Sequence, residues 1–399
     1  MNTKVRLITA AITAALLLSG CNVSVNTTPE PAQEETPAAE PGNESAAAEA
    51  ETKSEVTAAE DENEPPAGTS VYEDPKSLPE YTYQGDEKYM DVICKYMVDY
   101  EKQFTDNGQV KVYIPFNIIV ETDESDPDDI LVYGSYNVDG FRLLNTTLFT
   151  ESGSRSFGTF HLKTVADGKY EVTDAELPLV EEECEELFAP IDGLYKKISE
   201  TYDKEADKAR ADSIAQYVSA NSLNITQWQD FGHKPVAVEG AAPTSDADNI
   251  YHYDSPLGYS IDFDLRDVSL NASDDDMFSK IEDIDTGTLM VIKSYTESDP
   301  DKAVNTALSD ADTDMNVSDI TLADFEIGDG IKCRRGDSDV PLDDGRIFRY
   351  VCLATPASNG TITLVLTTTI EKDAPGLSAD ELVEAFNGML SSFCLPSGE

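Results

Sequence analysis

The hydrophobic positions change their period along the chain, and each period predicts a kind of secondary structure. At the start of the first apolar region, large side chains recur every three or four residues. This spacing predicts an amphipathic helix, with Asp86 placed to cap it. The apolar stripe is Tyr89, Ile93, Tyr96, Met97, Tyr100 and Phe104. Strand-like runs follow over 110–177: VKVYIPFNIIVE, DILVYGSYNV, FRLLNTTLF, FGTFHLKTV and KYEVTDAEL.

Helical patterns return near 182–200 and 204–220, and Asn221 is expected to end the second helix. The tetrapeptide ADGK at 166–169 predicts a hairpin turn, because Gly168 accepts a positive φ. A long helix packed on an antiparallel sheet is an α+β arrangement.

A second set of strands follows residue 249. It begins with IYHYDSPLGYSIDFD and TLMVIKSY, and a helix opened by Asp299 and Pro300 comes next. The strands SDITLADFEI, GIKCRRGD, RIFRYVCLAT and TITLVLTTTI follow. A last helix has a capping box from Ser378 to Glu381 and an apolar stripe that predicts contact with a core. That stripe is Leu382, Phe386, Met389, Leu390 and Phe393.

Between the two sets, small, polar and acidic residues replace any hydrophobic pattern at 239–249. The length of the foldable sequence also favours two domains. We therefore predict an α+β protein with domains at 81–238 and 250–399, each an antiparallel sheet packed with helices, and a linker at 239–249.

The N-terminus has a different pattern. Lys4 and Arg6 precede an apolar run, 7–18, that is shorter than the roughly 20 residues a membrane-spanning helix needs. This arrangement is typical of an export signal. The run ends in Leu18-Ser19-Gly20-Cys21, which resembles the lipobox of bacterial lipoproteins. The resemblance implies a signal peptide over 1–20, acyl chains such as palmitate on Cys21, and a place on the extracytoplasmic face of the cell membrane. An ordinary signal peptide is the alternative.

Residues 21–80 are rich in Pro, Glu and Ala, and positions 22–80 hold fifteen acidic residues against two lysines. So few apolar residues predict a disordered acidic tether. The whole chain has 78 acidic and 28 basic residues, a formal charge of −50. This charge repels phosphate backbones and so excludes nucleic acid as a partner. It also leaves membrane attachment to the lipid, and it permits a cationic partner or none.

Two regions resemble known families. The phrases ILVYGSYNVDGFRLLNTTLF, GTFHLKTVADGKYEVTDAEL and WQDFGHKPV are similar to the NTF2-like (cystatin-like) domains of lipoproteins from Gram-positive bacteria, over 85–237. This likeness implies a sheet curled into a cone that holds a ligand, an active site or packed side chains. SPLGYSIDF and a terminal helix ending in LSSF resemble the PsbP/Mog1-like fold over 250–395, whose members are mainly binding or accessory proteins.

Catalytic and metal-binding motifs are missing from the sequence. The three histidines stand in no metalloprotease or nucleophile-elbow motif, and there is no glycine-rich phosphate loop. DADTDMN at 310–316 imitates the start of a calcium loop. However, Met315 stands where the loop needs Gly, and Thr321 where it needs a bidentate Glu, so we expect a solvated loop. We predict no metal, no cofactor and no catalytic residue.

The aromatic residues of the first region leave two alternatives open, a packed core or the lining of a cone-shaped pocket. Arg142 and Arg155 are rare cations there, and each either orients an anionic ligand or makes an ion pair. The ligand-binding candidates are Tyr133, Tyr136, Arg142, Phe160 and His161.

Cysteines in an exported chain can form disulfides. Cys333 and Cys352 lie in two strands that flank SDVPLDDG. In a hairpin centred between Leu342 and Asp343 they are directly opposite, with Cβ atoms about 4.5–5.5 Å apart. A disulfide needs roughly 3.5–4.5 Å, so this register predicts a Cys333–Cys352 bridge. The alternative is that both are small buried hydrophobic residues.

These observations together predict a membrane-anchored envelope lipoprotein that acts as a non-catalytic binding, sensing or accessory protein. Its partners are the membrane, through the lipid on Cys21, and an envelope protein or small ligand. The alternative is an envelope enzyme with its active site in the cone of the first domain.

Overall fold

The computed structural model describes residues 78–396, apart from 106–109, 273–274, 282–286, 313–319 and 373–374. The expected signal peptide, Cys21, the tether up to residue 77 and most of the loop at 310–316 therefore lie outside the described residues. No helix in the described part is both long and apolar enough to cross a membrane. The described chain is α+β, as the hydrophobic pattern predicts.

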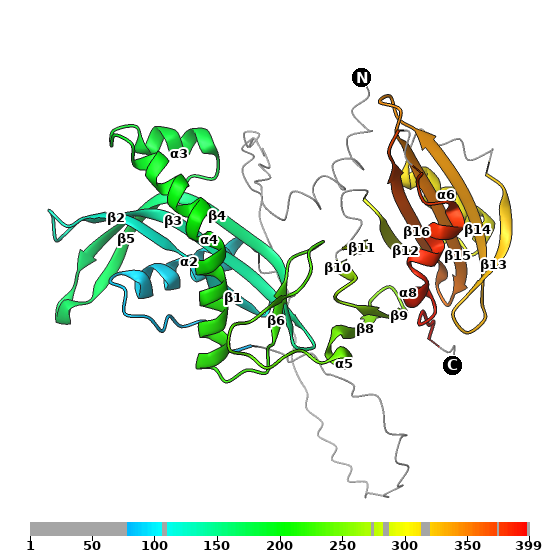
Figure 1. Cartoon of the computed structure of the whole chain (residues 1–399), viewed down its shortest axis with the longest axis horizontal. Coiled ribbons are helices and arrows are strands. Elements are labelled where there is room, and N and C mark those ends of the chain that lie inside the picture. Colours follow the sequence, from blue (N-terminus) through cyan, green and yellow to red (C-terminus); the bar gives the residue numbers. More distant parts are fainter. Residues whose placement is uncertain are drawn as a thin grey trace, which may run out of the picture. The chain divides into compact units, whose positions relative to one another are not determined.

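Two long strands form the spine of the first sheet (Figure 1). Strands β3 and β4 pair antiparallel over almost their whole length. The first half of β3 also pairs with β2 and the second half with β1, whereas β4 pairs first with β6 and then with β5. The strands are β1 Val112–Pro115, β2 Ile118–Asp123, β3 Ile130–Leu144, β4 Thr147–Thr164, β5 Tyr170–Glu176, β6 Gln227–Gln229 and β7 Val236–Ala237.

Helix α2 (Met90–Thr105) packs on this sheet through the predicted stripe. Ile93 and Met97 are buried in one cluster with side chains of β3 and β4, although Phe104, at the end of the stripe, is exposed. The Asp86 cap is wrong, because the helix begins only at Met90. The preceding residue, Tyr89, takes a φ of 77°.

The helices expected at 182–200 and 204–220 are divided differently. Helix α3 (Glu181–Phe188) stops before Pro190, which has no N–H to donate to a continuing helix. Helix α4 (Leu194–Ala220) starts after Gly193, at a φ of 72°, and ends at Asn221 as predicted. The turn predicted at ADGK is confirmed as a short 3₁₀ segment, η1 (Ala166–Gly168), between β4 and β5.

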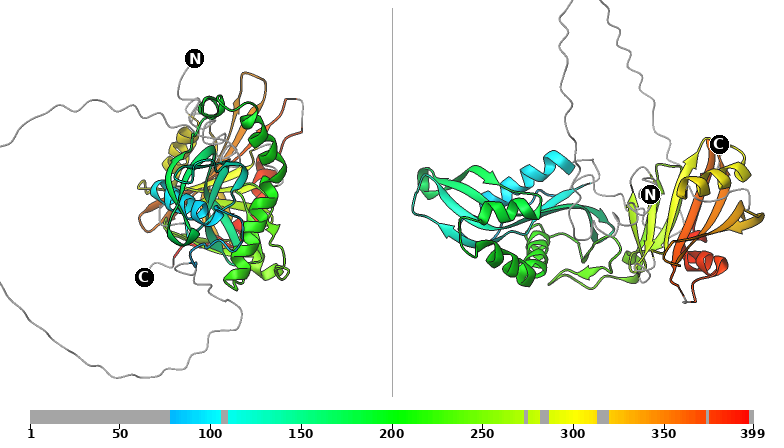
Figure 2. Two further views of the ribbon diagram at one scale, coloured as in Figure 1. Left: turned by 90° about the vertical axis from the view of Figure 1, so that its left-hand side faces the viewer. Right: turned by 90° about the horizontal axis from the view of Figure 1, so that it is seen from above.

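The second sheet is antiparallel throughout, in the order β10-β11-β12-β16-β15-β14-β13. Helix α6 (Pro300–Ala311) covers one face, while α7 (Ala379–Ala385) and α8 (Asn387–Leu390) cover the other, as the right view of Figure 2 shows. The strands are β10 Val268–Ala272, β11 Asp276–Lys280, β12 Leu289–Tyr295, β13 Leu322–Ile327, β14 Ile331–Pro341, β15 Ile347–Ala357 and β16 Gly360–Ile370, beside a hairpin of β8 Ile250–Ser255 and β9 Tyr259–Asp264.

Both helix signals of the second region are confirmed. Asp299 caps α6 by accepting a hydrogen bond from the backbone N–H of Asp301. At the start of α7, Ser378 and Glu381 each accept a hydrogen bond from the other's backbone N–H, at 3.2 and 2.8 Å. The five residues of the predicted stripe all belong to one buried cluster.

The register predicted for the β14–β15 hairpin is wrong. Gly336, and not Cys333, lies opposite Cys352, so the hairpin is centred on Asp344. The turn sits later than predicted because Gly345 takes the left-handed position, at a φ of 89°. The shift is therefore three residues.

A shift by an odd number of residues moves side chains to opposite faces of a sheet. Cys333 accordingly lies in the cluster beneath α7 and α8, and Cys352 in the cluster beneath α6. Both thiols are buried and free. In this register the two cysteines are not opposite each other, so the geometric argument for a Cys333–Cys352 bridge no longer holds. The structure instead matches the alternative, in which both are small buried hydrophobic residues.

Buried contacts join the two sheets. Leu144 and Phe149, where β3 ends and β4 begins, belong to the core cluster of the second sheet. The Gln229 side chain donates a hydrogen bond to the carbonyl of Leu265 at 2.7 Å. The segment 239–249 contains a short helix, α5 (Asp246–Asn249), capped by Ser245. The division into two domains around this segment stays a prediction.

Candidate functional site

The ligand-binding candidates of the first sheet are not brought together in one pocket. Tyr136 and Phe160 are fully buried beneath α2, with ring centroids 4.6 Å apart. Tyr133 lies in another cluster, against Phe188 of α3. His161 is on the surface, where its Nδ1 is 2.7 Å from a carboxylate oxygen of Asp129. In this structure the aromatic candidates are core side chains.

Arg142 is engaged within the protein. A bulge in β4 leaves Glu151 without a partner on β3, and the Glu151 carboxylate is 2.5 Å from Arg142 Nε. The guanidinium also donates to the carbonyl of Leu270 at 2.8 Å, so Arg142 links β3 to the second sheet. Arg155 is exposed, and its guanidinium carbon is 4.9 Å from the centre of the Tyr202 ring.

A second arginine of the first region is also enclosed. Arg210 of α4 has its Nε 2.5 Å from Asp139, and both terminal nitrogens bond to Asp230 at 2.7 Å. The ring of Trp228 covers the guanidinium at 4.3 Å. Burial raises the pKa of Asp139 to about 6, although Arg210 opposes this. Since these groups bind one another and are nearly closed to solvent, we assign them a structural role.

Two clefts lie beside the turn that joins β9 to β10. The larger, cleft 1, has a volume of about 540 Å³. Its lining includes Gln227, Lys234, Asp246, Asp264, Arg266 and Asp267. It is within the size range of small-ligand sites, about 300–1,000 Å³.

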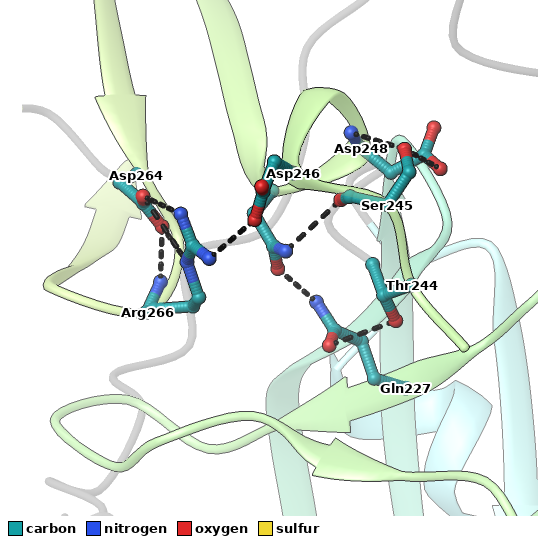
Figure 3. Close-up of polar contacts among 8 residues, drawn as sticks. Gln227, Thr244, Ser245, Asp246, Asp248, Asp264 and Arg266 are labelled. Carbon is teal, nitrogen blue, oxygen red and sulfur yellow. Dashed lines mark hydrogen bonds and ion pairs between the residues drawn. The ribbon is translucent and has the colours of Figure 1, made fainter.

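One wall of cleft 1 is a hydrogen-bonded polar network (Figure 3). The Gln227 amide donates to Thr147 and to Asn249, at 2.8 and 2.9 Å, and accepts from Thr244 at 3.1 Å. Asn249 in turn donates to the carbonyl of Ser245 at 3.1 Å. These bonds connect α5 and the segment before it to β6.

Arg266 is the best-positioned cation of cleft 1. Its Nε and one terminal nitrogen bond to Asp264, at 2.9 and 2.6 Å, and the other terminal nitrogen bonds to Asp246 at 2.9 Å (Figure 3). Burial alone would raise the pKa of Asp264, but the hydrogen bonds from Arg266 lower it. The Arg266 side chain nevertheless stays 47% exposed. It is held in place and open to the cleft.

Cleft 2, beside the same turn, has a volume of about 350 Å³. Asp264 and Asp267 line both clefts, which places cleft 2 next to cleft 1. The apolar lining of cleft 2 is Phe263, Val268, Phe386 and Met389. Asp267 is exposed, and its carboxylate takes part in no ion pair with the described residues.

Sequence reasoning missed both clefts. Asp264, Arg266 and Asp267 stand in DLRD, one of many acidic tetrapeptides in a chain with 78 acidic residues. Only the fold brings this turn beside Gln227. In the described part of the chain, no group of three or more histidine, cysteine or acidic side chains is arranged to hold a metal ion.

Comparison with known proteins adds little. No family model and no curated protein matches this sequence. A crystal structure of a protein from Bacteroides thetaiotaomicron VPI-5482 is similar at a TM-score of 0.24 and 12% identity, over 37% of this chain and 48% of that one. The chain thus spans about half the length of that protein, and a likeness this weak shows neither the fold nor the function of this chain.

Proposed function

We propose that this chain is a cell-envelope lipoprotein, anchored by the lipid on Cys21, that binds a small polar ligand in cleft 1 without transforming it. The observation that carries the proposal is the position of Arg266. It is bonded to Asp246 and Asp264, yet its side chain is 47% exposed and lines the cleft.

The donors of Arg266 support this role. A guanidinium has five N–H groups in a planar fork. Three are engaged by the two aspartates, which leaves one on each terminal nitrogen for a ligand carboxylate. The carboxylate of Asp267, which pairs with no cation among the described residues, lines the same cleft and suits a ligand ammonium group. A ligand with both charges, such as a free amino acid or a betaine, matches this pattern.

The sequence features support the same proposal. The likeness of Leu18-Ser19-Gly20-Cys21 to a lipobox accounts for the place of the protein, and the likeness of the second region to PsbP/Mog1-like proteins agrees with a binding or accessory role. The NTF2-like likeness of the first region leaves an envelope enzyme as the alternative. The one feature of Asp139 that favours an enzyme is its raised pKa of about 6. Its carboxyl is only 8% exposed and is bound to Arg210, so it is poorly accessible to a substrate.

Anchoring is tested with Cys21→Ser. We expect the variant to leave the membrane fraction or to accumulate as a precursor, because no thiol is available for the acyl chains. Fractionation and mass measurement of the intact chain provide the readout. A variant that stays in the membrane at the mature size would contradict the lipoprotein proposal.

Ligand binding is tested by thermal melting of the full chain with a panel of free amino acids and betaines. A ligand that binds only the folded state raises the melting temperature as its concentration passes the Kd. We expect zwitterions to raise it, and we expect mono-anions and mono-cations of similar size to have less effect. No shift with any member of the panel would count against cleft 1 as a ligand site.

A further inference from the structure

Cleft 2 has an apolar floor next to a charged rim. Phe263, Val268, Phe386 and Met389 line it, and each is at most 4% exposed. At the edge lies Ile250, 44% exposed and one of the few large hydrophobic residues open to solvent among those described.

The rim carries more negative than positive charge. Asp262, Asp264 and Asp267 line the cleft, against Lys280. Asp264 is bound to Arg266, and Asp262 lies 2.5 Å from Nδ1 of His252. The Asp267 carboxylate has no ion-pair partner among the described residues, so it is the group available to a cation.

We infer that cleft 2 holds a short segment of a partner protein in which an apolar side chain stands next to a lysine or arginine. The apolar side chain would fill the space over Phe386 and Met389, and the neighbouring cation would bind Asp267. This inference rests on the proposed binding function and extends it from a small ligand to a protein partner.

Charge selects this occupant over two others. The acidic tether of the same chain, with fifteen acidic residues against two lysines at 22–80, would be repelled by the rim. A second copy of a chain with a formal charge of −50 would be repelled as well. A basic segment would instead be drawn in by the same field, and its association would slow as salt is added.

Gly388 is a position where a larger side chain can be introduced to fill cleft 2. It lines cleft 2 from α8, and a Cβ added there meets no atom within 4 Å. Gly388→Leu should therefore occupy the cleft without disturbing the core, and helix propensity favours the change. Asp267→Lys reverses the charge at the rim. Asp128→Lys, at an exposed residue of the first region, is the matched control for charge.

The test uses the full chain in a non-ionic detergent and a fluorescent peptide of alternating lysine and leucine, followed by anisotropy. Two further peptides separate charge from apolar contact: one has serine in place of leucine, the other glutamate in place of lysine. We expect tight binding of the lysine–leucine peptide alone. Gly388→Leu should weaken it about tenfold or more, and Asp267→Lys about two- to tenfold. Asp128→Lys should leave it unchanged.

Equal binding of the lysine–serine peptide, or an unchanged Kd in Gly388→Leu, would overturn the inference and indicate adsorption by net charge alone. A melting temperature for each variant confirms that it is folded. If the zwitterion panel raises the melting temperature while the peptides do not bind, only this inference fails. If neither binds, the proposed binding function fails with it.

Discussion

Two arginines in this molecule are each held by two aspartates, but they differ in their exposure to solvent. Arg210 is held by Asp139 and Asp230, and Arg266 by Asp264 and Asp246. The side chain of Arg210 is 15% exposed and covered by Trp228, whereas that of Arg266 is 47% exposed and faces a cleft. The comparison teaches that an ion pair alone does not mark a site. Its access to solvent separates a structural group from one that can bind a ligand.

The largest expected effect is the loss of the enclosed arginine. Arg210→Met leaves Asp139 and Asp230 without their cation inside the first region, and breaking a buried pair in this way costs about 3–5 kcal/mol. Chemical denaturation of the full chain measures the free energy of unfolding. A loss below about 1 kcal/mol would mean that water reaches this cluster, and the contrast between the two arginines would disappear.

A buried carboxylate that forms no ion pair with the described residues extends the comparison. Asp276 is 1% exposed and accepts hydrogen bonds from the hydroxyls of Tyr253, Ser255 and Tyr259. In Asp276→Asn the amide nitrogen replaces one acceptor with a donor, so a buried hydroxyl loses its partner. We expect the free energy of unfolding to fall by about 1–3 kcal/mol. Asp128→Asn, at an exposed carboxylate, should leave it unchanged.

The pH dependence of stability tests the enclosed cluster by another route. Burial raises the pKa of Asp139 from 3.8 to about 6, against the opposing charge of Arg210, and Asp230 and Glu101 also face it. A raised carboxyl pKa means that the folded state binds the proton more tightly. Its contribution to stability is therefore complete below pH 3.8 and is lost as the pH rises through about 6.

Asp139→Asn removes this titration. We expect the stability of the variant to change less than that of the parent chain between pH 4 and 7, a window set by the two pKa values of Asp139. Denaturation curves at several pH values provide the measurement. Parallel profiles for variant and parent would show that Asp139 titrates as an exposed carboxyl does.

The smallest effect is expected at the open arginine. Arg266→Met removes ion pairs that are accessible to solvent, and such pairs contribute about 0–1 kcal/mol. The variant should therefore unfold almost as the parent chain does, and any ligand effect can then be attributed to the cleft. A loss as large as that of Arg210→Met would make Arg266 a structural residue.

The sequence predicts those features that depend on near neighbours along the chain. The stripe of α2, the caps of α6 and α7 and the turn at Gly168 all follow from local spacing. The same holds for the α+β class. Strands β10 and β11 were missed, because the mostly polar sequence 271–276, which includes the end of β10 and the start of β11, hides their alternation.

The strand register and the clefts depend on contacts between residues that are far apart in the sequence. Gly345 sets the β14–β15 turn later than the predicted position, and Cys333 and Cys352 are therefore not opposite each other. Arg266 becomes a candidate ligand-binding residue because it lines cleft 1 together with Gln227 and Asp246. These residues are distant from it in the sequence, and only the fold brings them together. With 78 acidic residues to choose from, no spacing rule selects the aspartates that hold it.

The most direct test of the account is a calorimetric titration of three proteins with the zwitterion that most raises the melting temperature. They are the parent chain, Arg266→Met and Arg346→Met. Arg346 bonds to Asp344 two residues before it, as Arg266 bonds to Asp264, but it does not line cleft 1. The account predicts that binding is lost in Arg266→Met and unchanged in Arg346→Met. Equal binding by all three proteins would contradict it.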